Sequence, residues 1–111
     1  MVADTLTSAS TLLFRSFILS LRAKNAAQRT IEGYSEAVRQ LGAFLEGKGM
    51  PLALQSIRRE HVETFIAELL AKWKPAIASN RYRGLMQYFR WLVEEGEIKQ
   101  APMAHEAPKD A

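Results

Sequence analysis

The chain offers few side chains that could act as a nucleophile or a general base. Tyr34 and Tyr82 fall within helical repeats of apolar residues, which favours core positions with hydrogen-bonded hydroxyl groups. Tyr88 is the third tyrosine, and no base is expected beside any of the three. His61 stands between two glutamates on a predicted helix, where an exposed side chain is more common than a general base. We therefore expect a chain that is not an enzyme by itself.

Composition argues against a bound metal or cofactor. The chain contains no cysteine, and His61 and His105 are far apart in the sequence, so zinc has no plausible ligand set. No glycine-rich phosphate loop is present. The apolar stretches are broken by Arg15, Ser16 and Ser20, well short of the roughly 20 residues that span a bilayer, and no secretory signal is present. We expect a soluble, cytoplasmic protein with no cofactor and no membrane partner.

Positive charge is concentrated in two segments of the chain. Residues 22–29 contain three basic residues and residues 72–90 contain five, with no acidic residue in either segment, so together they hold eight of the 15 Lys and Arg residues. The formal net charge is only +3, because the rest of the chain is acidic. Two such segments suit a polyanionic partner such as nucleic acid. Ordinary solvated helix ends are the alternative.

The elements that must position these charges are predicted to be helices. With 48% hydrophobic and 24% charged residues, the 111-residue chain has the composition of one compact globular domain. Alanine and leucine dominate, and no stretch alternates apolar and polar residues as a half-buried strand does. The predicted fold class is all-α.

The first two helices are predicted on either side of Asn25. The first runs from Thr11 to Lys24, after a flexible lead-in over residues 1–10. The second starts after Asn25, which has the spacing of a capping box with Gln28, and glycines at 47 and 49 end it. The predicted core positions of the two helices are Leu13, Phe17, Leu21, Ile31, Tyr34, Val38, Leu41 and Leu45.

Two further helices are predicted after a loop over residues 48–55. The third has Ser56 as its cap, and the fourth starts at Pro75 because proline suits a first helical turn. Gly96 stops the fourth helix, and residues 99–111 are expected to form an extended linker. The predicted core positions are Val62, Phe65, Ile66, Leu69, Leu70, Trp73, Ala78, Tyr82, Leu85, Phe89 and Leu92.

The outer face of the fourth helix is predicted to carry Asn80, Arg83, Gly84, Gln87 and Trp91. Arginine can bond guanine and Asn or Gln can bond adenine, whereas Lys, Ser and helix-start amides can hold phosphate. A solvated face, with the tryptophan packed under the tail, is the alternative. The second helix can contact DNA only at its start, because its later glutamates would repel phosphates. The predicted DNA-binding residues are Arg22, Lys24, Arg29, Thr30, Gly33, Lys72, Lys74, Ser79, Asn80, Arg81, Arg83 and Gln87.

Short motifs follow one another along the chain in an informative order. They are residues 30–34 (TIEGY), Leu41 with Phe44-Leu45, Asn80-Arg81, residues 87–98 (QYFRWLVEEGEI), Ala101-Pro102-Met103 and Pro108-Lys109. In this order and spacing they resemble the N-terminal core-binding domain of tyrosine recombinases, the phage integrase family. The last two motifs resemble the Asn-Pro-Met that closes this domain and the Pro-Lys that opens the linker to the catalytic domain.

The resemblance implies a four-helix, orthogonal, SAM-like bundle over residues 11–98 that forms one half of a clamp around DNA. In that family the starts of the second and fourth helices face the major groove, and the catalytic Arg, Lys, His and Tyr lie in a C-terminal domain. The expected function is DNA binding in site-specific recombination or integration. The expected partners are double-stranded DNA, a C-terminal catalytic domain that is absent from this chain, and other recombinase protomers on DNA. A small helical protein-protein interaction module, docking through Trp91 and the apolar tail, is the competing interpretation.

Overall fold

The structure, a computed structural model, describes residues 8–103 of the chain. Helices and one short 3-10 turn follow one another as α1 (Ser8–Ala23), α2 (Gln28–Gly47), η1 (Leu54–Ser56), α3 (Arg59–Lys72) and α4 (Pro75–Glu94). No strand occurs within the described residues. The predicted all-α, four-helix fold class is therefore confirmed.

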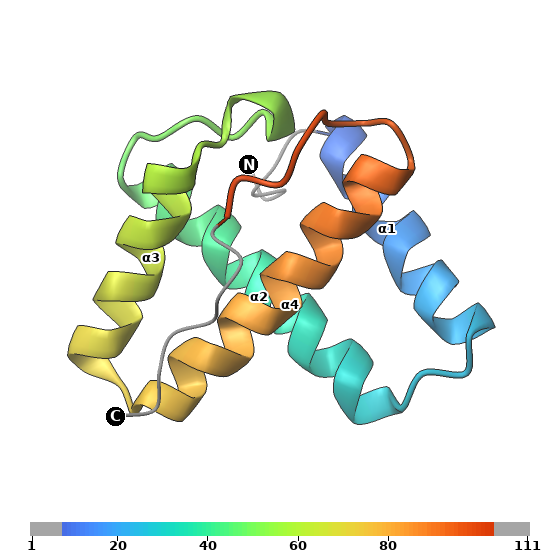
Figure 1. Cartoon of the computed structure of the whole chain (residues 1–111), viewed down its shortest axis with the longest axis horizontal. Coiled ribbons are helices and arrows are strands. Elements are labelled where there is room, and N and C mark those ends of the chain that lie inside the picture. The colour runs from blue at the N-terminus through green and yellow to red at the C-terminus, as the bar shows by residue number, and fades with distance from the viewer. Residues whose placement is uncertain (1–7, 104–111) are drawn as a thin grey trace.

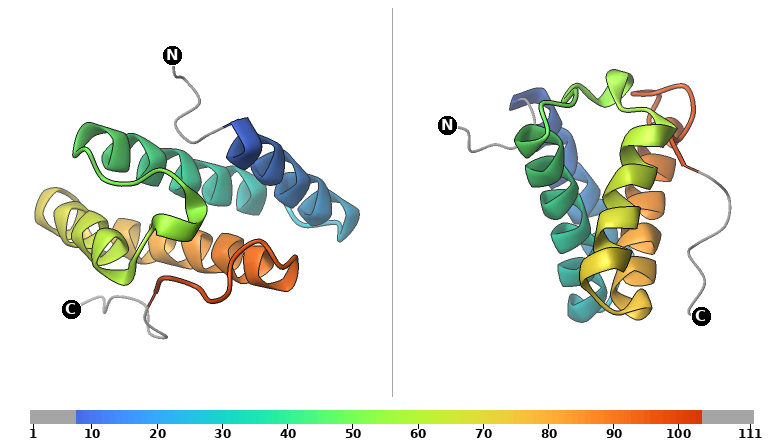
Figure 2. Two further views of the ribbon diagram at one scale, coloured as in Figure 1. Left: turned by 90° about the horizontal axis from the view of Figure 1, so that it is seen from above. Right: turned by 90° about the vertical axis from the view of Figure 1, so that its left-hand side faces the viewer.

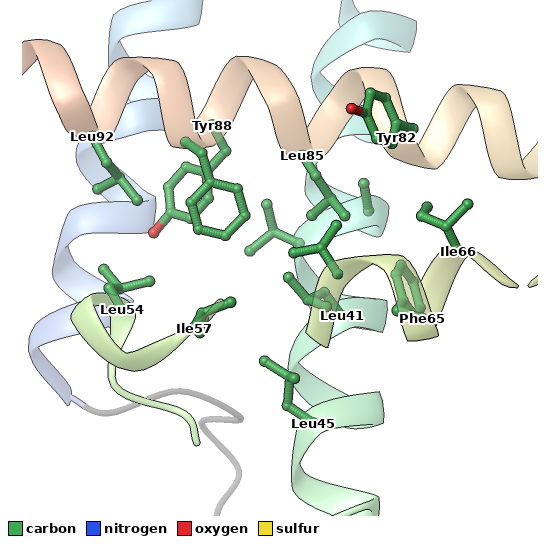
Figure 3. Packing of buried hydrophobic residues seen from close by; sticks show 14 of the residues in the cluster. Leu41, Leu45, Leu54, Ile57, Phe65, Ile66, Tyr82, Leu85, Tyr88 and Leu92 are labelled. Atoms are coloured by element: carbon green, nitrogen blue, oxygen red, sulfur yellow. The ribbon is translucent and has the colours of Figure 1, made fainter. Parts of the chain in front are cut away.

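The four helices form two layers around one apolar core. α2 and α4 cross at the centre of the molecule (Figure 1), with α1 beside α2 in one layer and α3 beside α4 in the other (Figure 2). Side chains from α2, η1, α3 and α4 converge between the layers (Figure 3). The predicted core positions that are buried are Phe17, Ile31, Val38, Leu41, Leu45, Val62, Phe65, Ile66, Leu69, Ala78, Tyr82, Leu85, Phe89 and Leu92.

The crossing of α2 and α4 depends on Gly84. A Cβ atom at this position would lie 2.9 Å from the Ala37 Cβ and 3.3 Å from the Tyr34 Cα. Gly84 is therefore buried against α2, and the prediction that it lies on the outer face of α4 is wrong. The sequence repeat gives the apolar stripe of a helix, but it does not reveal how closely another backbone approaches the edge of that stripe.

Asn25 ends the first helix rather than capping the second. It has a φ of 60°, its N–H donates to the Arg22 carbonyl at 3.0 Å, and the next N–H, from Ala26, donates to the Leu21 carbonyl at 3.0 Å. This is the Schellman pattern, in which asparagine can replace the usual glycine. α2 has Ala27 as its N-cap, with no side-chain cap hydrogen bond. The predicted capping box at Asn25 is therefore wrong, and α1 begins at Ser8 rather than at Thr11.

The third helix begins later than predicted. Ser56 is the last residue of η1, and α3 starts at Arg59 with Arg58 as its N-cap. The Arg58 N–H donates to His61 Nδ1 at 2.8 Å, so the imidazole satisfies one backbone donor of the helix start. The role of Ser56 as a cap is therefore wrong, and His61 has a structural role that its sequence context did not reveal.

Both ends of the fourth helix agree with the prediction. Pro75 is its first residue, and Gly96 ends it with a φ of 79°, a conformation that suits glycine. Beyond α4, Ile98 is buried, and Ala101 and Met103 are partly buried against the core. Residues 104–111 of the predicted linker lie outside the described residues, as do residues 1–7 of the predicted lead-in.

Candidate nucleic-acid interface

The first basic segment and the start of the second lie along the same edge of the molecule, at its two ends. The junction of α1 with α2 and the junction of α3 with α4 both lie along the lower edge in Figure 1, and the right-hand view of Figure 2 agrees. We call this the helix-start edge and define it by residues 22–30 and 72–83. Residues from two distant parts of the sequence thus share one side of the fold.

Most of the cationic groups on the helix-start edge are exposed and without an acidic partner. Arg22, Lys24, Arg29 and Lys74 are exposed and form no ion pair with any described residue. Lys72 is the exception, because its Nζ lies 3.5 Å from Glu68 Oε1. Partial desolvation raises the pKa of Glu68, but hydrogen bonds and charges from Lys48 and Lys72 together bring it below its ordinary value. The unpaired cations are the strongest attraction for a polyanion on this surface.

Helix dipoles add little to this attraction. Each junction places the C-terminal end of one helix next to the N-terminal end of another, so their partial charges oppose each other. The first turns of α2 and α4 nevertheless present backbone N–H groups, and neither helix has a side-chain cap hydrogen bond. These amides can donate to phosphate oxygens if a backbone approaches the edge.

One stripe of polar side chains runs along the outer surface of α4. Asn80, Arg83 and Arg90 are exposed, and Gln87 is half-buried between them. Their spacing places them on one helical face. Arg83 Nη1 donates to Asn80 Oδ1 at 3.2 Å, so the two groups are held together but remain open to solvent. Arg90, which extends the stripe, is not among the predicted DNA-binding residues, although its charge and its helical spacing place it there.

Not every predicted residue is available to a ligand. Ser79 is only 2% exposed, so its hydroxyl group is not on the surface, and the prediction that it contacts phosphate is wrong. Arg81 is half-buried, and its Nε donates to Gln40 Oε1 at 2.9 Å, which ties α4 to α2. Thr30 and Gly33 are half-buried along the first turns of α2.

Trp91 serves the core rather than the outer face. Its ring lies 5.6 Å from that of Phe17 and is stacked on Tyr88 at 6.4 Å, measured between ring centroids. It is therefore packed between α1 and α4, and its predicted place opposite the apolar stripe is wrong. Aromatic contacts of this kind stabilise a core beyond the area that they bury.

The described residues contain no group of three or more His, Cys, Asp or Glu side chains that could hold a metal ion. None of the described helices is long and apolar enough to cross a bilayer. Among the side chains that could be nucleophiles, Tyr82 is 5% exposed and Tyr88 is 1% exposed. The Tyr88 hydroxyl has no hydrogen-bond partner among the described residues, and burial raises its pKa well above the ordinary value. A protonated, buried phenol is a poor nucleophile.

Comparison with known proteins agrees with the geometry. The family model for the phage integrase N-terminal SAM-like domain matches residues 13–98, from α1 to just beyond α4. No curated protein and no solved structure matches the chain. Because the family model covers most of the chain, the chain belongs to the phage integrase N-terminal SAM-like domain family.

Proposed function

We propose that the chain binds double-stranded DNA through the helix-start edge, as the non-catalytic N-terminal domain of a tyrosine recombinase. The observation that carries this proposal is that the acid-free basic segment 22–29 and the start of the acid-free basic segment 72–90 lie along the same edge of the fold (Figure 1). Lys and Arg side chains there contact phosphates, and the stripe on α4 that begins at Asn80 and Arg83 reads bases in the major groove. The family context of DNA integration supports this assignment.

Catalysis is assigned to a separate domain of the recombinase. Tyr82 and Tyr88 are buried, and Tyr34 is partly buried with its ring 6.3 Å from that of Phe17. Strand transfer needs an accessible nucleophile and a cluster of positive groups around the reacting phosphate. The chemistry is therefore assigned to a C-terminal catalytic domain, and the family context suggests this domain and other protomers on DNA as partners.

The competing function is that of a module that docks a protein partner. The apolar groups on which it relied are packed within the domain. It relied on Trp91 and the apolar tail, but Trp91 packs against Phe17 and Tyr88. Ile98 is buried in the core, and Met103 is partly buried against it. These apolar groups are already used inside the domain.

Salt dependence tests the proposal. A labelled duplex titrated with the chain is expected to bind weakly, because a half-clamp lacks the effective concentration that a tethered second domain supplies. The affinity is expected to fall steeply between about 50 and 200 mM salt as counterions are released from the phosphates. Absence of binding at the lower salt concentration, or an affinity insensitive to salt, would contradict the proposal.

A second experiment tests the assignment of chemistry to another domain. Supercoiled plasmid incubated with the pure chain is expected to remain supercoiled and free of protein. Nicked plasmid, or a covalent complex through any of the three tyrosines, would contradict the non-catalytic assignment.

A further inference from the structure

We propose that Trp73 is a DNA-contacting residue that packs its indole ring against the sugar-phosphate backbone between phosphates held by Lys72 and Lys74. The inference rests on the DNA-binding function proposed above. The apolar repeat of α3 had predicted that Trp73 and Leu70 are core residues. Both residues are exposed, Leu70 by 40% and Trp73 by 58%, so that assignment is wrong.

The backbone of Trp73 is fixed although its ring is exposed. The residue is the C-cap of α3 and has an extended conformation, with a φ of −131° and a ψ of 175°. Its N–H donates to the Leu69 carbonyl at 2.7 Å, and α4 begins two residues later at Pro75. The chain leaves the helix at this point, so the indole no longer follows the apolar stripe. A short, rigid connection therefore holds a large aromatic group in solvent.

The surroundings of the ring favour a nucleic-acid partner. Lys72 and Lys74 flank it in the sequence and are both exposed, and the junction that contains them lies on the helix-start edge. Only Lys72 has an acidic neighbour among the described residues, Glu68 at 3.5 Å. Two cations next to an exposed aromatic residue in the sequence suit a phosphodiester backbone, in which charged phosphates alternate with sugars.

A shallow groove beside the ring extends the contact surface. Trp73 lines it together with Phe44, Phe65 and Ile77, and its volume is about 400 Å³. Lys72 and Arg81 both line this groove against the single carboxylate of Glu68, so its lining has a net positive charge even though Lys72 pairs with Glu68 and Arg81 donates to Gln40. This net positive charge favours polyanionic DNA, rather than an apolar peptide without acidic residues, as the partner that lies against the groove. The groove is also continuous with the helix-start edge through the Lys72 side chain.

The two tryptophans allow a direct test by fluorescence. In the Trp91→Phe variant, Trp73 is the only reporter, and its emission is expected to change in proportion to the duplex bound, as measured separately by anisotropy. In the matched Trp73→Phe variant, the packed Trp91 is expected to report no change. If Trp91→Phe fails to fold, the unsubstituted chain labelled with 5-fluorotryptophan gives two ¹⁹F resonances, of which only that of Trp73 is expected to shift.

Affinity provides the second readout. We expect Trp73→Ala to weaken duplex binding roughly tenfold, because the apolar ring surface covered in the complex is lost, while leaving the thermal midpoint nearly unchanged because the ring is exposed. Duplex binding with no response from Trp73 and no loss in Trp73→Ala would overturn this inference and leave the proposed function intact. A change in Trp73 emission that is caused by self-association of the chain without DNA would also overturn it. Failure of the unsubstituted chain to bind duplex at all would overturn the proposed function.

Discussion

The helix-start edge and the edge opposite to it differ in how their charges are arranged. On the helix-start edge, Arg22, Lys24, Arg29 and Lys74 are exposed and form no ion pair with a described residue. The opposite edge contains the end of α2, η1, the start of α3 and the end of α4 (Figure 1). Glutamates are interspersed with its cations in the sequence, and two of these cations, Lys48 and Arg59, form ion pairs.

Two ion pairs illustrate this neutralisation. Arg59 Nε lies 2.9 Å from Glu63 Oε2, and Lys48 Nζ lies 3.4 Å from Glu68 Oε2, a carboxylate that Lys72 of the helix-start edge shares. Exposed pairs of this kind add little to stability, but they cancel the local field that would attract a polyanion. The pairing of positive charges, rather than their total number, therefore distinguishes the proposed binding surface from the opposite edge.

The largest effect is expected from a change in the core, because the structure of both edges depends on it. Phe89 is 1% exposed, and Phe89→Ala is expected to cost about 3–5 kcal/mol in the free energy of unfolding, a large share of the stability of a small domain. Thermal melts measure this loss. The matched control is Leu19→Ala, in a side chain that is 66% exposed, where the change is expected to stay within about 0.5 kcal/mol. A melt of Phe89→Ala equal to that of the parent would contradict the assigned core.

The next largest effect is expected in duplex affinity, from a surface substitution that leaves the core unchanged. Arg83→Ala is expected to weaken duplex binding by about 1–3 kcal/mol, because the proposed base contact in the major groove would be lost. Anisotropy titrations measure this change, with Lys99→Ala on the opposite edge as the control that keeps the parent affinity. Equal affinity of Arg83→Ala, Asn80→Ala and the parent would show that α4 does not read DNA.

A pair of glycines sharpens the comparison, because only one of them lies at the helix crossing. Gly84→Ala is expected to destabilise the fold by about 1–2 kcal/mol, since its Cβ would lie 2.9 Å from the Ala37 Cβ. Gly33→Ala places its Cβ in open space within α2 and is expected to stabilise the fold by about 0.5–1 kcal/mol. Denaturant titrations of the two variants measure the contrast. Equal shifts in the same direction would mean that α2 and α4 do not approach as closely as described.

The smallest effect concerns the opposite edge alone. His61→Ala removes the acceptor for the Arg58 N–H and is expected to cost about 0.5–1 kcal/mol of stability, with duplex binding unchanged. His61→Glu is expected to recover most of the loss, because a carboxylate at this helical position can close the same box. A loss of DNA affinity in a folded His61→Ala variant would count against the separation of the two edges.

Local signals in the sequence predict the fold better than they predict the surface. The start at Pro75 and the stop at Gly96 follow from backbone chemistry that each residue carries with it. Asn25 suits a helix start and a helix end equally well, and only the path of the chain decides between them. Ser79 and Gly84 lie at the margins of the apolar stripe of α4. There the packing of neighbouring helices, rather than the helical period, determines whether a residue is buried.

Exposure of Trp73 could not be predicted for a related reason. Its spacing continues the apolar repeat of α3, but the helix ends one residue earlier, at Lys72. The charge pattern alone also does not show that residues 22–29 and the start of residues 72–90 lie along the same edge. That arrangement requires α2 and α4 to cross as they do in Figure 1.

Paired charge reversals on the two edges test the DNA-binding role of the helix-start edge most directly. Arg29→Glu with Lys74→Glu changes the net charge by the same amount as Arg58→Glu with Lys99→Glu, so total charge is matched. If the helix-start edge binds DNA, the first variant loses most of its duplex affinity and the slope of log affinity against log salt falls by about 2, whereas the second variant keeps the parent slope. Equal losses in the two variants would show that net charge alone drives binding and would contradict a DNA-binding site at the helix-start edge.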